Sequence, residues 1–196
     1  MMEVKQAEKL VKLARKSISA YFKGEDVKTG AGLKKEFDEK SGVFVSLYID
    51  DELVGCIGYV EPTMPLWESV VQAAQGAAFE DPRFPPLTKK QYKKLKIEIS
   101  VLSKLREIDV KKPSEYLSKI KIGKDGLVIK DEFGYGILLP QVAKDWDWGP
   151  EEFLNQTCLK AGLSPDCWNN MKRNVYKFQA QVFTEDKGRV VEKKLY

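Results

Sequence analysis

The chain has 196 residues, 43% hydrophobic and 32% charged, which predicts a folded, water-soluble protein with a sizeable core. Its formal net charge of +4 is too small to predict nucleic-acid binding by itself. The sequence contains no histidine, which excludes Ser-His-Asp catalysis, Cys-His catalysis and histidine-ligated metal sites. It shows neither a signal peptide nor an apolar run of membrane-spanning length, so we expect a cytoplasmic location.

The three cysteines, Cys56, Cys158 and Cys167, are odd in number and show no CxxC spacing. Such a set predicts neither a disulfide framework nor a thiolate zinc site, so we expect reduced thiols. Cys158 falls on the apolar stripe of a predicted helix and Cys167 precedes Trp168, and both are expected to pack in the core. The sequence shows no phosphate-binding glycine loop and no cluster of metal ligands. No metal site is therefore predicted, and the cofactor is left unknown.

The first predicted element is an amphipathic helix that ends near Gly24. Its apolar residues recur at three- and four-residue steps, at Val4, Ala7, Leu10, Val11, Ala14, Ile18, Tyr21 and Phe22. The opposite face is rich in lysine, so we expect one face of this helix to be buried and the other to be solvated.

Residues 42–62 predict a β-hairpin around which the other elements are organised. Residues 43–49 alternate in polarity, residues 50–52 form a polar turn, and residues 53–60 form an apolar second arm. This arm carries Gly55 and Gly58 on either side of Cys56 and Ile57. Glycine weakens a strand, so the pair predicts a bulge or a surface where another group approaches the backbone closely. We expect the missing side chains to leave room for a ligand.

Small residues dominate the next predicted helix, residues 66–78, which contains Gly76. A glycine inside a helix costs about 1 kcal/mol relative to alanine, so we expect the glycine arm to pack against this helix. The helix ends before Asp81-Pro82, because proline disfavours helical geometry in the preceding residue. A proline-stiffened loop follows, then a short helix whose Thr88 forms a capping box, and a strand over residues 95–101.

The remaining chain predicts short strands and helices. These are a strand at 120–122, a meander to residue 139 with turns at 123–126 and 131–134, a helix over 150–161, and a final strand over 176–182. Strands and helices alternate without regular βαβ units. We therefore predict an α+β fold, with a mainly antiparallel sheet flanked by helices and a smaller lobe within about residues 103–150.

Several spaced motifs together resemble one known family. They are Leu-Val-Gly-Cys-Ile-Gly at residues 53–58 and the segments 42–45, 81–87, 97–102, 126–127, 139–143, 153–154 and 158–163. In this order they are similar to the AMMECR domain, called after the Alport syndrome, midface hypoplasia and elliptocytosis chromosomal region. The resemblance covers nearly the whole chain, as one domain over residues 1–196. It implies a two-lobed α+β domain of unequal lobes, with both termini in the larger lobe.

The resemblance also sets what can be expected of function. The family hallmark has arginine where this chain has Val54, so a role that needs a guanidinium there does not carry over. The family has no established biochemical function. Its archaeal and bacterial members lie near, or are fused to, Memo-type proteins, and lie beside radical S-adenosylmethionine proteins. This context implies a partner of one of these kinds and a shared modification reaction.

Three residues are candidates for chemistry. Cys56 is a candidate catalytic thiol, with packing as a small apolar side chain as the alternative. Arg83 can bind a carboxylate or phosphate, or else form a structural clamp with Asp81. Glu98 is a candidate acid, base or cation ligand, with a solvated or paired side chain as the alternative. The expected binding residues are Gly55, Cys56, Ile57, Gly58, Asp81, Arg83 and Phe84.

Three functions follow from these candidates. In the first, a cleft beside the Gly-Cys-Ile-Gly arm binds a small molecule or a modified residue, in an enzymatic or accessory role. In the second, the same surface is a non-catalytic module that docks a Memo-like or radical S-adenosylmethionine protein. The third is nucleic-acid binding through the lysines of residues 89–96. With only Tyr92 as an aromatic platform, that cluster favours a solvated helix face instead.

Overall fold

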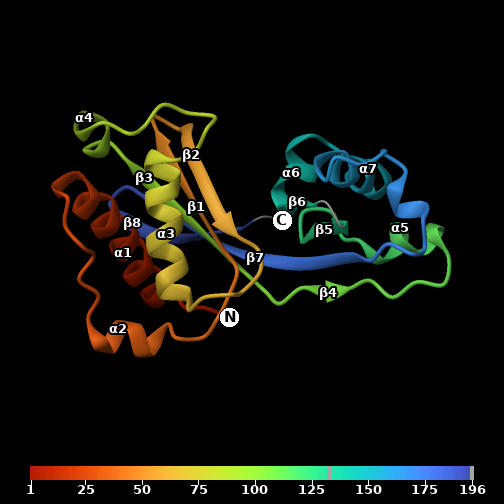
Figure 1. Cartoon of the computed structure of the whole chain (residues 1–196), viewed down its shortest axis with the longest axis horizontal. Coiled ribbons are helices and arrows are strands. Elements are labelled where there is room, and N and C mark those ends of the chain that lie inside the picture. The colour runs from red at the N-terminus through yellow and green to blue at the C-terminus, as the bar shows by residue number, and fades with distance from the viewer. Residues whose placement is uncertain (132–133, 195–196) are drawn as a thin grey trace. The chain divides into compact units, whose positions relative to one another are not determined.

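The structure is a computed structural model that describes residues 1–131 and 134–194 (Figure 1). Contacts divide the described chain into two compact units, residues 1–102 with 181–194, and residues 103–180. The long strand β7 (Val175–Asp186) contributes its beginning to the second unit and its end to the first. Within the described ranges, no helix combines the length and apolar character that crossing a membrane requires. The middle of the turn predicted at 131–134 lies outside the described residues.

The first unit is a sheet with two helices packed on one face (Figure 1). The edge strand β2 (Glu52–Tyr59) pairs with β1 (Val43–Ile49), and β1 pairs with β3 (Lys96–Leu102), each time antiparallel. The end of β7 follows, and β8 (Arg189–Lys193) pairs with it. Helices α1 (Val4–Lys23) and α3 (Leu66–Phe79) cover the sheet, and α2 (Ala31–Glu36) and α4 (Lys89–Tyr92) are short.

Strand alternation sorts the side chains of this sheet onto two faces. Val45, Leu47, Ile97 and Ile99 are at most 1% exposed and share a hydrophobic core with α1 and α3. The residues between them therefore point to the opposite face. On that face the polar side chains of Ser46, Glu98 and Ser100 are also buried.

The predicted hairpin is confirmed, and so is a bulge in its glycine arm. The register of β1 and β2 shifts between Leu47, which pairs with Gly55, and Tyr48, which pairs with Leu53, so Val54 has no partner opposite it. The packing of α3 against the glycine arm is confirmed as well. A Cβ atom on Gly55 would lie 1.9 Å from the carbonyl oxygen of Ala77 in α3.

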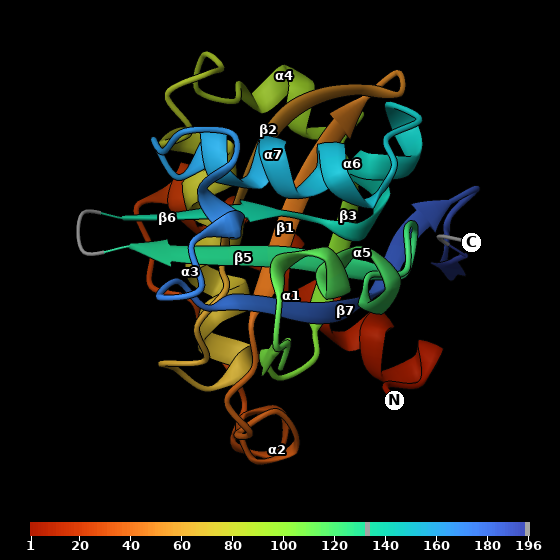
Figure 2. The same ribbon diagram turned by 90° about the vertical axis from the view of Figure 1, so that its right-hand side faces the viewer.

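The second unit contains a small antiparallel sheet (Figure 2). β5 (Asp125–Asp131) lies between β7 and β6 (Gly134–Leu138), and β4 (Arg106–Glu107) pairs with the other edge of β7. Helices α6 (Pro140–Asp145) and α7 (Pro150–Lys160) pack on this sheet, and η1 (Pro113–Glu115), α5 (Tyr116–Lys119) and η2 (Cys167–Asn169) are short. The strand predicted at 120–122 is wrong, because the Asp125 carboxylate accepts the Lys121 amide at 3.0 Å and holds a turn there. The α+β class with a mainly antiparallel sheet is confirmed.

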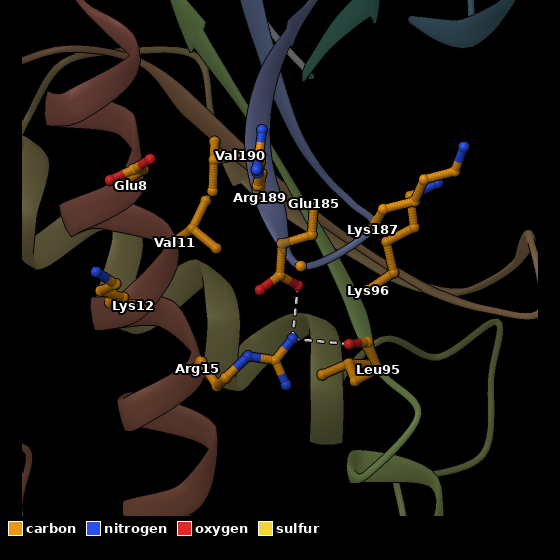
Figure 3. Close-up of a pocket in the computed structure, with 11 residues that line it drawn as sticks. Glu8, Val11, Lys12, Arg15, Leu95, Lys96, Glu185, Lys187, Arg189 and Val190 are labelled. Atoms are coloured by element: carbon orange, nitrogen blue, oxygen red, sulfur yellow. Dashed lines mark hydrogen bonds and ion pairs between the residues drawn. The ribbon is translucent and has the colours of Figure 1, made fainter.

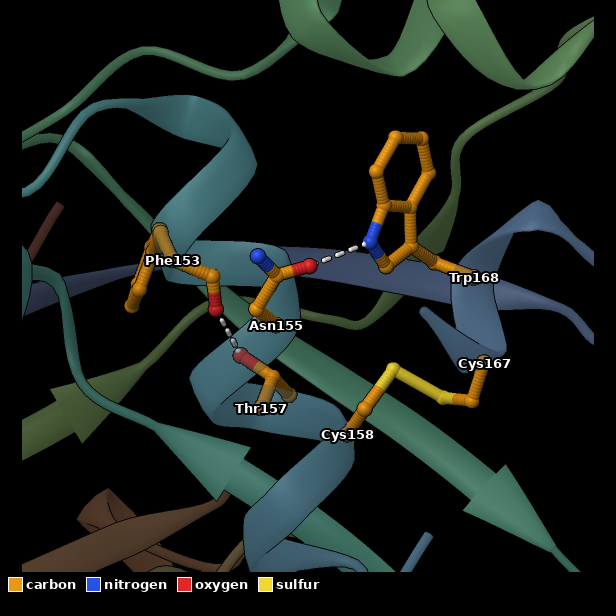
Figure 4. The surroundings of a disulfide bond; sticks show 6 residues. All are labelled: Phe153, Asn155, Thr157, Cys158, Cys167 and Trp168. Carbon is orange, nitrogen blue, oxygen red and sulfur yellow. Dashed lines mark hydrogen bonds between the residues drawn. A yellow bond between two sulfur atoms is a disulfide. The ribbon is translucent and has the colours of Figure 1, made fainter. Parts of the chain in front are cut away.

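Cys158 and Cys167 form a disulfide, so the expectation of three reduced thiols is wrong (Figure 4). Both cysteines are buried, as predicted, at 0% and 5% exposure. The chain leaves α7 through Gly162, which adopts a positive φ of 77°, and η2 brings Cys167 back beside the helix. The pairing therefore depends on a tertiary turn that the cysteine spacing alone does not reveal. Trp168 is anchored next to it by a 2.8 Å hydrogen bond from its indole nitrogen to Asn155 (Figure 4).

Candidate functional site

Three side chains form a polar row across neighbouring strands of the first unit. Ser46 on β1 pairs with Cys56 on β2 and with Glu98 on β3, so all three lie on the face opposite the α1 and α3 core. Ser46 and Glu98 are only 7% and 4% exposed, whereas Cys56 is partly exposed. The Ser46 hydroxyl donates a hydrogen bond to the Cys56 sulfur over 3.2 Å. We call this row the Cys56 face.

The backbone of Cys56 is held at the sheet edge by the loop that follows α3. Its amide donates to Asp81 Oδ2 at 2.9 Å, and its carbonyl accepts from Arg83 Nη2 at 2.8 Å. Arg83 in turn donates from Nε to Asp81 Oδ1 at 2.9 Å and from Nη2 to Oδ2 at 2.8 Å. Because β2 is an edge strand, this clasp satisfies the two backbone groups that a further strand would have satisfied. The structural clamp of Asp81 and Arg83, one of the two alternatives drawn from the sequence, is therefore present.

The hydrogen bonds of the clasp favour the ionised form of the Asp81 carboxyl group. The hydrogen bond from Arg83 is the main reason that the pKa of Asp81 falls from 3.8 to about 2, with the amides of Cys56 and Arg83 contributing. The same bond is the main reason that the pKa of Arg83 is raised. The Asp81 side chain is 2% exposed, but the Arg83 side chain is 58% exposed and lies over the Phe84 ring. Arg83 thus presents a fixed guanidinium to solvent.

Glu98 sits in a second polar contact of the same face. Tyr48 Oη donates to Glu98 Oε1 in a long hydrogen bond of 3.5 Å, and Lys193 Nζ lies 3.4 Å from Oε2. Burial, and next the Glu98 charge, raise the pKa of Tyr48 to about 12, so this tyrosine stays a hydrogen-bond donor at neutral pH. Glu98 is therefore paired, as in the alternative given for it above.

Thr184 of β7 adds an unsatisfied group to this face. Glu185 points toward α1, where it pairs with Arg15, so strand alternation turns Thr184 the other way. Thr184 is 8% exposed, and its hydroxyl has no hydrogen-bond partner among the described residues. A buried hydroxyl without a partner is costly, which makes it a candidate contact for a bound group.

The glycines do not leave the space that was expected of them. A Cβ on Gly55 would strike the α3 backbone, and a Cβ on Gly58 would lie 2.4 Å from the Phe44 ring. Ile57 lies on the α3 side, where it faces Gly76. The expectation of an open cleft at the bare positions is therefore wrong, because the chain fills both of them itself. What the glycines do is fix the position of Cys56 between them.

The sequence reasoning missed Ser46, Tyr48, Lys193 and Thr184. Ser46 and Tyr48 carried a signal, since both occupy the alternate positions of β1 that face away from the core. No sequence signal marks Lys193 or Thr184. Both residues reach the Cys56 face only because β7 pairs with β8. Among the described residues, no three carboxylates or thiols gather as they would around a metal ion.

The fold and site together define an α+β domain whose edge strand carries a Gly-Cys-Ile-Gly segment clasped by an Asp-Pro-Arg loop. The family model described as AMMECR1 matches residues 11–183, and the chain belongs to this family.

Archaeal relatives are similar over most of their length. Protein MJ0810 of Methanocaldococcus jannaschii is 46% identical over 189 residues, which cover 94% of each chain. A protein of Methanothermobacter thermautotrophicus is 44% identical over 178 residues, covering 90% of this chain and 93% of its own. The crystal structure of uncharacterized protein PH0010 from Pyrococcus horikoshii has a TM-score of 0.92 and 41% identity, and 98% of both chains is covered. These likenesses establish family and fold, and leave the reaction to be argued from the site.

Proposed function

We propose that the Cys56 face binds a small molecule or a modified residue, in an enzymatic or accessory role. The observation that carries the proposal is the partly exposed thiol of Cys56, which accepts a hydrogen bond from the buried Ser46 hydroxyl. Buried polar groups destabilise a fold unless they are paired, and an apolar row here would pack at lower cost. Ser46 and Glu98 are paired in this way, whereas the buried Thr184 hydroxyl of the same face has no partner among the described residues, and this supports a bound ligand.

Each residue of this site has a proposed role. Cys56 contacts the ligand and is the candidate nucleophile, because it is a free and partly exposed thiol. Glu98 is the candidate proton carrier, and Tyr48 and Lys193 hold its two oxygens in place. Arg83 orients an anionic group of the ligand while Asp81 keeps the guanidinium in place. Val54 packs against the core, and the proposal assigns no role to it.

A metabolite screen by thermal shift tests this proposal. A ligand of the Cys56 face should raise the melting temperature of the wild type, and Cys56→Ala should lose that shift while Cys56→Ser keeps part of it. The matched control is Cys158→Ala with Cys167→Ala, which removes the disulfide-bonded cysteines of the second unit and should retain the shift. A ligand shift of equal size in wild type and Cys56→Ala would contradict the assignment of the site.

A second candidate function is docking of a Memo-like or radical S-adenosylmethionine protein. The observation that favours it is the exposed Arg83 guanidinium, stacked on Phe84 and fixed by Asp81 as a rigid surface group. Arg83→Lys keeps a cation but loses the forked contact, so we expect weaker co-purification with such a partner. Turnover by the isolated protein would contradict a purely docking role.

Nucleic-acid binding through residues 89–96 predicts a steep loss of affinity with salt, and salt-insensitive binding would contradict this third function.

We further propose that the two contact units are the lobes of unequal size expected from the family resemblance, so that the smaller lobe extends past residue 150. Limited proteolysis tests this, since a cut between lobes should fall just after β3, near residues 102–103, whereas the second boundary lies inside β7 and should resist cleavage. A first cut inside β1 or β5 would contradict it.

A further inference from the structure

A groove of about 440 Å³ lies between α1 and the hairpin formed by β7 and β8 (Figure 3). It is on the α1 side of the sheet and shares no lining residue with the Cys56 face. Its volume falls within the range of small-molecule sites. Val11, Leu95 and Val190 supply the apolar part of its wall.

Positive charge dominates the groove. Five cationic side chains line it, Lys12, Arg15, Lys96, Lys187 and Arg189, against the two carboxylates of Glu8 and Glu185. In Figure 3, Lys12 lies on one side of the Arg15 and Glu185 pair, and Lys96 and Lys187 lie on the other. An anion in the groove would thus meet cations from both sides.

Two of the five cations are already paired, Arg15 with Glu185 and Lys96 with Asp51 at 3.2 Å. Arg15 Nη2 lies 2.5 Å from Glu185 Oε2 and 2.7 Å from the Leu95 carbonyl, and Glu185 also accepts the Ile97 amide at 2.8 Å. This pair neutralises itself and fixes the floor of the groove. Lys12, Lys187 and Arg189 form no ion pair within the described part of the chain.

The backbone conformation of Lys187 independently indicates that its side chain has a binding role. Lys187 has a φ of 46° and precedes Gly188 with a φ of 79°, at the tip of the hairpin. Turns of this kind prefer asparagine, aspartate or glycine, because a longer side chain is strained at positive φ. Strained residues concentrate at binding sites, where the side chain is retained for a contact.

We propose that this groove binds a small molecule that carries a chain of phosphates, with its uncharged part against Val11 and Val190. A chain of phosphates offers several negative charges to Lys12, Lys187 and Arg189, which have no ion pair among the described residues, and ammonium groups bind phosphate as point charges. The site is independent of the Cys56 face, and either proposal can fail without the other.

Calorimetric titration with tripolyphosphate, adenosine triphosphate and adenosine tests the proposal. Both phosphate compounds should bind and adenosine should not. Lys12→Gln and Lys187→Asn should each weaken binding roughly fivefold, as expected for loss of one partly exposed ion pair. Lys187→Asn is informative because asparagine suits the positive φ, so loss of affinity cannot be assigned to a damaged turn.

Lys5→Gln is the matched control, because Lys5 is an exposed lysine of the same helix that does not line the groove. It changes the net charge equally and should leave affinity unchanged, and Cys56→Ala should do the same. If neither phosphate compound binds, or if Lys5→Gln weakens binding as much as Lys12→Gln, the groove is not an anion site.

Discussion

Asp81 completes the backbone hydrogen bonding of the edge strand β2, as a further strand would. Its carboxylate accepts the Cys56 amide and orients Arg83 onto the Cys56 carbonyl, so two side chains complete the hydrogen bonding of one edge residue. The clasp thereby fixes the backbone from which the thiol projects. A charge-assisted network with a buried carboxylate rigidifies a site more than a single bond does.

Asp81→Asn should lower the free energy of unfolding by about 1–2 kcal/mol near pH 6. The pKa of Asp81 is about 2 in the folded chain against 3.8 ordinarily. A depressed pKa contributes stability that is complete above the ordinary value and is lost as pH falls through 4 toward 2. Denaturant titrations at two pH values measure this, and the difference between wild type and variant should shrink at low pH.

Asp38→Asn is the control, since Asp38 is exposed. It should change stability by less than about 0.5 kcal/mol at either pH. A difference between wild type and Asp81→Asn that does not depend on pH would contradict the role assigned to this carboxylate.

Some residues of the candidate site could be singled out from the sequence, and others could not. Cys56, Asp81 and Arg83 follow from the sequence because they sit in motifs whose spacing is local. Ser46 was present in the alternation of β1 but carries no motif of its own. Lys193 and Glu98 are 95 residues apart, and only the pairing of strands brings them to 3.4 Å. Single-sequence patterns report local periodicity and do not encode such long-range contacts.

At the scale of elements, the glycine arm is explained by the helix beside it. α3 is rich in small residues, and the carbonyl of Ala77 occupies the place where a Gly55 side chain would lie. The sequence predicted this close packing correctly. It also suggested open space for a ligand, because a missing side chain looks the same in a sequence whether a neighbour or a ligand fills it.

Gly55→Ala should therefore lower the free energy of unfolding by about 2–3 kcal/mol or more, since the added carbon meets backbone that cannot move aside easily. Thermal and denaturant unfolding measure the change. Gly32→Ala in α2 is the control, because a Cβ there meets nothing within 4 Å. It should leave stability unchanged or raise it by up to about 1 kcal/mol. Equal stability of Gly55→Ala and wild type would contradict the packing described here.

The disulfide ties the end of α7 to η2 across a separation of nine residues. Closing a loop of this length restricts the unfolded chain, so replacing both cysteines with alanine should lower stability by about 2–3 kcal/mol. Denaturant unfolding with and without reductant measures this, and reductant should not change the double variant. Three free thiols in the unfolded, unreduced wild type would contradict the bond.

At the scale of the whole molecule, the sequence predicted the class of fold and most of its elements. The α1 stripe, the hairpin, the helix of small residues and the strand before Leu102 all follow from local periodicity. The errors have different causes. The strand expected at 120–122 is replaced by a local turn that the Asp125 carboxylate holds, and the disulfide of Cys158 and Cys167 depends on the turn that brings η2 back beside α7.

The most direct test of a ligand site at the Cys56 face is alkylation of the native protein with iodoacetamide, followed by intact mass. Cys56 is the free thiol among the three cysteines, so the mass change reports it alone. The account predicts one added group on the wild type without denaturation, and none on Cys56→Ala. Modification that appears only after unfolding would contradict it.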